Sequence, residues 1–281
     1  MPSTSIWRAT QAYGKQISDY VAQSQAQVAV ERIVLASADQ DHDDLKGVSI
    51  DGGMINIRTE GWKEFKSGVI FDVETSPKYD PDTQEWLEQP VARRQSYTAV
   101  LGSVEQFTPA LWHLAVEHQV PTAHDTVLVA DGAEWIWNVA ADYFPDSVEI
   151  IDWYHAVEHL AAAAKVCCPD DESAAQRWFK DKRDALFHGH VSCITDDLDH
   201  LQLPDHAHYF HVHRHRMRYQ EFQECGYPIG SGTVESAIKQ FKQRLAGPGM
   251  RWKRPSAQHM LTLCAASFSH QFDVLWTAAL A

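Results

Sequence analysis

The chain has 281 residues, 44% of them hydrophobic, and a formal net charge of −14 at pH 7. That length can bury a sizeable core in one large or two small domains, and the hydrophobic content is ordinary for a globular protein. No apolar run reaches the roughly 18 residues of a membrane span and no secretion signal is evident, so a cytoplasmic protein is expected. The five cysteines are odd in number and form no C-x-x-C pair, which is typical of reduced thiols.

The N-terminal part of the chain is expected to hold one helix and then three strands. A loose apolar stripe predicts a helix over 10–35, and the acidic stretch 38–45 is typical of a linker, so 1–46 would form an N-terminal helical segment. The polar segment 76–94, with three prolines, is expected to be a loop. A Gly-containing turn at 60–63 predicts a hairpin. The expected strands are 48–58, 65–74 and 97–102.

The middle of the chain alternates helix and strand. Helices are expected at 108–118 and 135–144, and strands at 126–130 and 148–151. Three strands followed by this alternation predict an α/β fold with a mixed five-stranded sheet flanked by helices. Residues of about 160–225 look mainly helical. They are expected to be a helical insertion within a domain spanning 47–281.

Two further helices are expected after this insertion. The first carries buried-type residues at helical spacing, stops before Gly247, and has Ser231 or Thr233 as its capping residue. Its apolar stripe consists of Val234, Ala237, Ile238, Phe241 and Leu245. The second is expected over 255–269.

Three carboxylates in different contexts are the main candidates for chemistry. Asp51 lies within a predicted strand, Asp131 closes another, and Glu235 lies in the first turn of a predicted helix. An aspartate at a strand end is usually a turn or cap residue, and a glutamate in a first turn usually complements the helix dipole. A carboxylate in mid-strand, however, is costly unless it is paired or metal-bound. Three such acids could hold two divalent metals for phosphoryl transfer, without histidine or cysteine ligands.

Four ordered strings carry a family resemblance: VSIDGGMINIRTEGWKEFKSGVIF, VLVADGAEWIWN, IIDWYHAVEHL and YPIGSGTVESAIKQFKQRLAGPGMRW. Together they resemble the DDE transposases of bacterial insertion sequences, specifically the ISKra-type family, over about 47–269. The resemblance implies an RNase H-like fold and metal-dependent DNA cleavage and strand transfer with two Mg²⁺ or Mn²⁺ ions. It places the catalytic, metal-binding triad on Asp51, Asp131 and Glu235.

The same resemblance extends to a D-x-x-H motif and to partners. Asp152 and His155 match the motif and are expected to support the active site. Transposon ends and target DNA are the implied partners, with a homodimer in the transposition complex and nucleoid association when DNA is bound.

One basic segment stands out on the acidic chain. The stretch 239–254 contains no acid, and a basic stretch of this kind suits phosphate contact, although a solvated helix face is the alternative. Trp252, among these cations, is the tryptophan best placed to stack on unpaired bases. The expected DNA-binding residues are Lys239, Lys242, Arg244, Arg251, Trp252, Lys253 and Arg254.

Two alternative functions remain open from the sequence. His155, Glu158 and His159 match H-x-x-E-H, the signature of a zinc hydrolase. A non-enzymatic DNA-binding remnant of a truncated transposase is the other, because only about 46 residues precede the first expected strand. The histidine-rich run 206–219 could bind metal, but phosphate contact from Arg214, Arg216 and Arg218 is the more plausible role.

Overall fold

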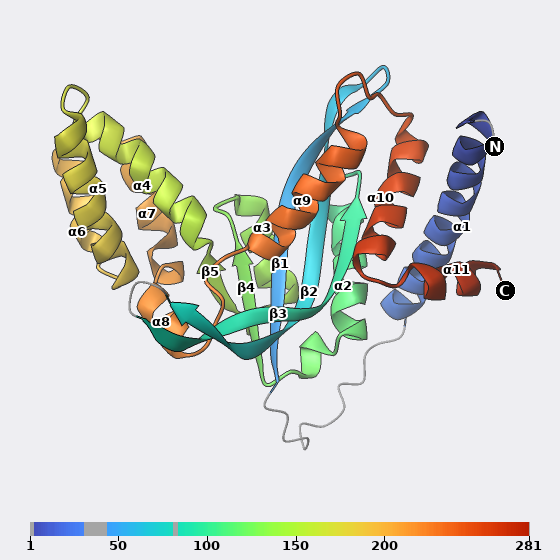
Figure 1. The fold of residues 1–281 in the computed structure, drawn as a ribbon, viewed down its shortest axis with the longest axis horizontal. Coiled ribbons are helices and arrows are strands. Elements are labelled where there is room, and N and C mark those ends of the chain that lie inside the picture. Colours follow the sequence, from blue (N-terminus) through green and yellow to red (C-terminus); the bar gives the residue numbers. More distant parts are fainter. Residues whose placement is uncertain (1–2, 31–43, 81–83, 281) are drawn as a thin grey trace.

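The computed structural model describes residues 3–30, 44–80 and 84–280 of the chain. Its centre is one five-stranded sheet of order β3-β2-β1-β4-β5 (Figure 1). β1 pairs antiparallel with β2, which pairs antiparallel with β3, whereas β4 and β5 run parallel to β1. This is the expected RNase H-like mixed sheet, and that prediction is confirmed. The strands are Leu45–Ile57 (β1), Gly61–Asp80 (β2), Glu85–Val100 (β3), Asp125–Ala130 (β4) and Val148–Ile151 (β5).

Helices cover both faces of the sheet because β1 is apolar on both. Val48 and Ile50 face a core with α2 (Val104–Glu117) and α3 (Glu134–Tyr143). Ile55 and Ile57 face a second core with α9 (Gly232–Leu245) and α10 (Arg254–Phe268). Successive strand residues point to opposite faces, so β1 serves both cores at once.

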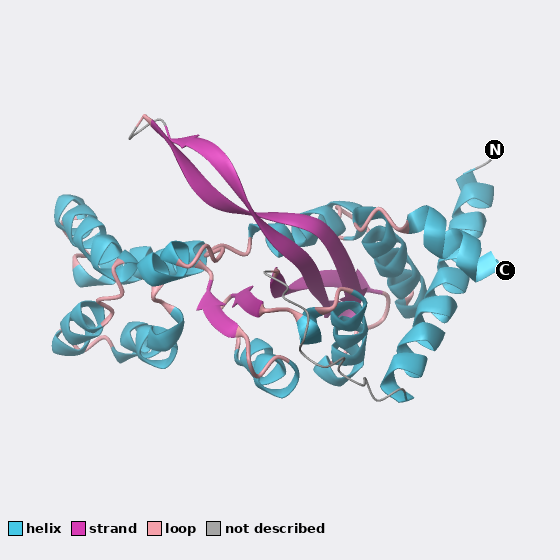
Figure 2. Ribbon diagram, turned by 90° about the horizontal axis from the view of Figure 1, so that it is seen from below, coloured by secondary structure: helices cyan, strands magenta, loops and turns pink. Residues whose placement is uncertain are grey.

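The expected loop at 76–94 is wrong for the described residues of that segment. The pairing between β1 and β2 ends at Leu45 and Val73. Beyond that point β2 and β3 stay paired with each other, from Glu74 and Val91 to Asp80 and Glu85, as a two-stranded ribbon. Figure 2 shows this two-stranded ribbon leaving the sheet. Cross-strand pairing gives the polar segment strand structure that period-two alternation did not reveal. Near its end the exposed rings of Tyr79 and Trp86 lie 5.6 Å apart.

The helical insertion lies between β5 and α9, as expected. Its helices stand beyond the β5 edge of the sheet (Figure 1). Buried side chains from several of them, including Leu160, Leu186 and Phe210, join the core beneath α2 and α3. The insertion therefore shares one continuous core with that side of the sheet. Its helices are Trp153–Cys167 (α4), Glu172–Phe187 (α5), Ser192–His200 (α6), Pro204–His213 (α7) and Tyr219–Glu224 (α8).

Helices from both ends of the chain meet beside α10 (Figure 1). α1 (Ser3–Val30) begins before the expected start at residue 10, and the rest of that expected helix and most of the linker fall outside the described residues. α11 (Phe272–Leu280) was not expected. Within the described residues, no helix combines the length and the apolar character that crossing a membrane requires.

Candidate functional site

Three neighbouring parallel strands carry a row of aspartates, one within β1 and one directly after each of β4 and β5. β1 and β4 reach the same level at Ile50 and Ala130, and β4 and β5 at Ala130 and Ile151. The next residue of each strand is an aspartate, and the last of them donates its backbone N–H to the Ala130 carbonyl at 2.8 Å. Register alone therefore brings the acids side by side across β1, β4 and the edge strand β5. In chain order they are Asp51, Asp131 and Asp152.

Asp51 and Asp131 each use one oxygen on a nearby backbone amide. Gly52 N–H donates to Asp51 Oδ1 at 2.6 Å, and Ala133 N–H donates to Asp131 Oδ1 at 2.9 Å. Among the described residues, neither Oδ2 atom has a hydrogen-bond partner. Both carboxylates thus present one oxygen that a cation could take.

The electrostatics of Asp51 reflect this crowding of acids. Burial raises the pKa of its carboxyl to about 6, and the neighbouring Asp131 adds to the rise. The Gly52 amide, His155 and Lys242 act in the opposite direction. A buried carboxylate that is costly to ionise beside a second acid is suited to a divalent cation, which would offset that cost.

Glu235 lies on the first turn of α9, beside the Asp152 end of the row. Ser231 Oγ donates to Glu235 Oε1 at 3.2 Å, and His155 Nε2 lies 3.9 Å from the same oxygen. Lys239 Nζ lies 3.7 Å from Oε2. Ser231 is the cap residue, as expected, but its hydroxyl holds Glu235 and makes no capping hydrogen bond.

Asp152 ties the two helices of the site together. Its side chain is fully buried; Oδ1 accepts the His155 N–H at 2.9 Å, and Oδ2 accepts the Ser231 N–H. Beside it, Trp153 N–H donates to the Ile229 carbonyl at 2.8 Å. One carboxylate therefore caps α4 and anchors the segment that leads into α9, which sets His155 opposite Glu235.

The described residues contain one group of three side chains with metal-ligand geometry. It consists of Asp152, His155 and Glu235, whose ligand atoms all lie within 4.8 Å of one another. Asp51 and Asp131 lie outside that limit. The structure thus joins Glu235 to the D-x-x-H pair directly, and to the other two acids through the shared row.

The H-x-x-E-H residues do not converge on a common point. His155 turns toward Glu235, while the His159 ring stacks on Tyr209 with centroids 3.7 Å apart. Glu158 is 77% exposed, with Oε2 3.7 Å from His155 Nδ1. Among the described residues, His159 belongs to no three-ligand group. This geometry does not favour the zinc hydrolase.

The basic segment divides into engaged and unengaged cations. Arg254 is held by Glu60 at 2.7 Å, and the Arg244 guanidinium lies 5.1 Å from the centre of the Phe268 ring. Three exposed cations make no ion pair with any described residue. They are Lys242, Arg251 and Lys253.

Trp252 is built into the fold more firmly than its neighbours. Its indole Nε1 donates to the Leu245 carbonyl at 2.7 Å, and its backbone bridges Ile57 at the end of β1. The exposed Trp7 ring lies 5.7 Å from it. Any base stacking at Trp252 would use only the part of the ring that these contacts leave open.

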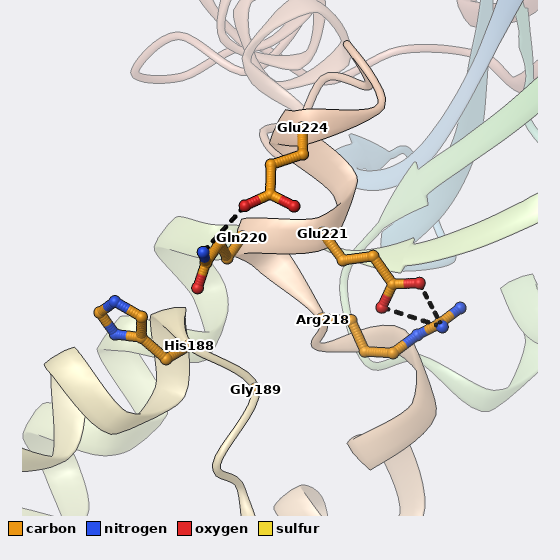
Figure 3. Close-up of a pocket in the computed structure, with 6 residues that line it drawn as sticks. All are labelled: His188, Gly189, Arg218, Gln220, Glu221 and Glu224. Carbon is orange, nitrogen blue, oxygen red and sulfur yellow. Dashed lines mark hydrogen bonds and ion pairs between the residues drawn. The ribbon is translucent and has the colours of Figure 1, made fainter.

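A separate cavity of about 260 Å³ lies between the end of α5 and α8 (Figure 3). His188 and Arg218 are among its lining residues, but both Arg218 hydrogen bonds go to Glu221 within the cavity wall. The Arg218 guanidinium is thus already paired. Glu224 accepts from the Gln220 amide at 2.8 Å and has no ion pair with a described residue, so the cavity offers a ligand no free cation.

Sequence reasoning missed the contacts that hold these acids in place. The row of three aspartates was visible as an Asp after each of three apolar runs, but only strand order makes it a row. The Ser231 hydroxyl and the Tyr209 ring gave no signal of their own. No family model matches this chain, and the curated proteins include none that is similar to it.

Proposed function

We propose that this chain is a DDE transposase that cleaves DNA and transfers strands with divalent metal ions. The observation that carries the proposal is the row of aspartates on three parallel strands with Glu235 held over it. Acids from two strands and a later helix match the triad that the sequence resemblance implies. The proposal uses every expected catalytic residue: Asp51, Asp131, Glu235, Asp152 and His155.

The donor set suits Mg²⁺ or Mn²⁺. Asp51 and Asp131 offer carboxylate oxygens without a partner among the described residues, and a cation there would offset the cost of ionising the buried Asp51 carboxyl. Asp51, Asp131 and Glu235 would hold two ions. When bound, such ions activate the attacking water or 3′-hydroxyl and stabilise the leaving oxygen.

The remaining residues orient this set. Asp152 and Ser231 fix where Glu235 and His155 lie, because the buried Asp152 carboxylate accepts hydrogen bonds from the first turn of α4 and from the residue that precedes α9. His155, within 3.9 Å of Glu235, is placed to hold that carboxylate in one orientation or to take a proton from its surroundings. None of these roles needs a covalent enzyme intermediate.

DNA would follow α9 away from the site. A helix rises about 1.5 Å per residue, so Leu245 lies roughly 15 Å from Glu235. Lys242 lies along this path, and Arg251 and Lys253 follow at its far end. An acidic protein would keep phosphates to such a strip, which suits transposon ends and target DNA bound within a homodimer. A cytoplasmic location beside chromosomal DNA follows from this proposal.

The test is cleavage of supercoiled plasmid and joining of a 3′-hydroxyl oligonucleotide to plasmid, each with Mg²⁺ or Mn²⁺. Asp51→Asn, Asp131→Asn and Glu235→Gln should each abolish both reactions, with circular dichroism unchanged. The matched control is Asp142→Asn, an exposed acid on α3 that should leave activity intact. Full activity in any of the first three variants would remove that residue from the triad.

A further inference from the structure

Helix α7 of the insertion lies directly against the turn that carries Asp131. A Cβ atom on Gly132 would lie only 2.5 Å from Tyr209 Cε2 and 3.3 Å from His213 Nε2. Such a contact is too close for any residue other than glycine unless the ring moves. The backbone next to Asp131 therefore rests on the edge of the Tyr209 ring.

Tyr209 is itself held between rings from other elements. The His159 ring on α4 stacks on it at 3.7 Å with 13° between the planes, and His213 lies 5.1 Å away. Trp137 on α3 continues the series at 6.0 Å from His213. We call these four side chains, His159, Tyr209, His213 and Trp137, the aromatic bracket.

The bracket spans the helices around the site. α4 presents His155 toward Glu235 and, one turn later, His159 toward Tyr209. Residues four apart share a helix face, so one face of α4 serves both the metal-ligand group and the bracket. The outer end of the bracket is closed by Arg216, whose guanidinium lies 4.3 Å from the Trp137 ring centre.

The bracket brings no charge near Asp131. Burial lowers the pKa of His213 to about 4, with Arg216 adding to the effect, so this imidazole is neutral at pH 7. Burial, then Asp131 and Asp152, raise the pKa of Tyr209 far above its usual range. Its hydroxyl is buried and has no hydrogen-bond partner in the described part of the chain. The bracket therefore acts on the Asp131 turn through packing and through the hydrogen bond between the His213 imidazole and the Gly132 backbone, with no charge involved.

We propose that Tyr209 is a positioning residue: its ring, clamped by His159, fixes the Asp131–Gly132 turn and so the direction of the Asp131 carboxylate. The helical insertion, which carries Tyr209, would then help to set the geometry of the site. The packing claim stands on geometry alone. Only its consequence for metal binding rests on the proposed function.

The packing claim is tested on the metal-free protein by hydrogen exchange. The Ala133 amide, which donates to Asp131 Oδ1, reports the order of the turn. Tyr209→Ala should make this amide exchange about tenfold faster, because local opening sets its protection. Tyr209→Phe should leave it unchanged, since the ring remains. The control is Tyr79→Ala, which removes an exposed ring from the ribbon.

The consequence is tested with Mn²⁺ alone by calorimetry or electron paramagnetic resonance. Tyr209→Ala should weaken Mn²⁺ binding by about tenfold, the usual effect of losing a group that orients a ligand. Tyr209→Phe should bind as the wild type does. In cleavage assays, Tyr209→Ala should need more Mn²⁺ for half-maximal rate but approach the wild-type rate at saturation.

Gly132→Ala gives an independent route if Tyr209→Ala fails to fold. The added methyl should push the turn off the ring and produce the same two losses. In the double variant, which combines Gly132→Ala with Tyr209→Ala, the added methyl no longer meets a ring. Its losses of exchange protection and Mn²⁺ affinity should therefore not exceed those of Tyr209→Ala alone. Additive losses would overturn the proposed contact.

The outcomes separate the two proposals. Wild-type exchange at Ala133 in Tyr209→Ala, or equal losses in the Phe and Ala variants, would overturn the role of the ring. If Asp131→Asn binds Mn²⁺ as tightly as the wild type while exchange behaves as expected, the packing holds and the proposed metal chemistry fails.

Discussion

At the scale of single residues, the ionisation of Asp51 costs free energy in the absence of metal. The pKa of its carboxyl is raised from 3.8 to about 6, first by burial and then by Asp131. A raised carboxyl pKa stabilises the fold at low pH, where the group is protonated in the native state. That contribution is lost as pH rises through the folded value of about 6.

Asp51→Asn should therefore stabilise the metal-free protein at pH 8 and have little effect at pH 4. We expect a gain of roughly 1–3 kcal/mol at pH 8, since the amide needs no ionisation. Urea unfolding in the presence of a chelator, across pH 4–8, measures it. Asp142→Asn on the surface of α3 should show no such trend, and a pH-independent effect of Asp51→Asn would contradict burial of the charge as the cause.

Asp152 should respond in the opposite way to the same substitution. An asparagine can accept only with its one oxygen, so its amide NH₂ would face the N–H of either His155 or Ser231. We expect Asp152→Asn to cost about 2–3 kcal/mol in the free energy of unfolding. Chemical denaturation at pH 7 is the measurement.

Asp171→Asn is the matched control for this substitution. Asp171 caps α5 by accepting the Ala174 N–H at 2.9 Å, with no second amide to satisfy among the described residues. Asparagine caps helices about as well as aspartate, so the change should be near neutral. Similar costs for the two variants would show that Asp152 is only a helix cap.

At the scale of elements, α9 and the loop after it carry two kinds of cation. Neutralising the three unengaged ones, Lys242, Arg251 and Lys253, should weaken DNA binding and flatten its salt dependence by about one unit per lost phosphate contact. Neutralising the engaged pair, Arg244 and Arg254, should reduce stability while leaving the salt slope close to that of the wild type.

The measurement is affinity for random duplex DNA over a salt series, with unfolding measured in parallel. Sequence preference should change little in either variant, because phosphate contacts position DNA without reading it. A wild-type slope after neutralising the unengaged three would leave them as a solvated surface.

Elements with their own periodicity were predictable, and those made by pairing were not. The helix carrying Glu235 was expected from its apolar stripe, and β4 from its run of buried residues. The ribbon of β2 and β3 was expected to be a loop because its residues 76–80 and 85–94 are polar and interrupted by Pro77 and Pro90. Its strand structure comes from the partner strand, which sequence patterns do not record.

The candidate site divides in the same way. Asp51 could be singled out because a carboxylate inside an apolar strand is costly, and Glu235 because of where its helix begins. The contacts of Asp152 with Ser231, and of Tyr209 with Gly132, join segments far apart in the chain. Nothing local to those residues specifies such contacts, so only the folded structure reveals them.

At the scale of the whole molecule, metal binding should appear as stability. At about 100 times the dissociation constant, a ligand specific to the folded state adds roughly 2.7 kcal/mol, which raises the Tm of a chain this size by about 5–10 °C. We expect this from Mn²⁺ or Mg²⁺ in the wild type, and not in Asp131→Asn or Glu235→Gln. Differential scanning calorimetry measures it.

Metal analysis of the purified protein completes this comparison. No tightly held zinc is expected, and treatment with a zinc chelator should leave Tm unchanged. One zinc per chain that is lost in His159→Ala would favour the hydrolase instead.

The sequence separation between contacting residues also determines at which stage of folding the site forms. The β1–β2 hairpin closes over neighbouring residues, whereas β1 meets β4 about 80 positions later, as in the Ser49 hydroxyl bond to the Val129 carbonyl. The Asp152–Ser231 tie spans 79 positions. Local contacts form early in folding and distant ones late, so pulse-labelled exchange should protect hairpin amides before those of Ala133 and Ser231. During synthesis, the hairpin can form while α9 is still unmade. A ribosome-bound chain would then carry Asp51 in place while the other members of the proposed metal site were still absent.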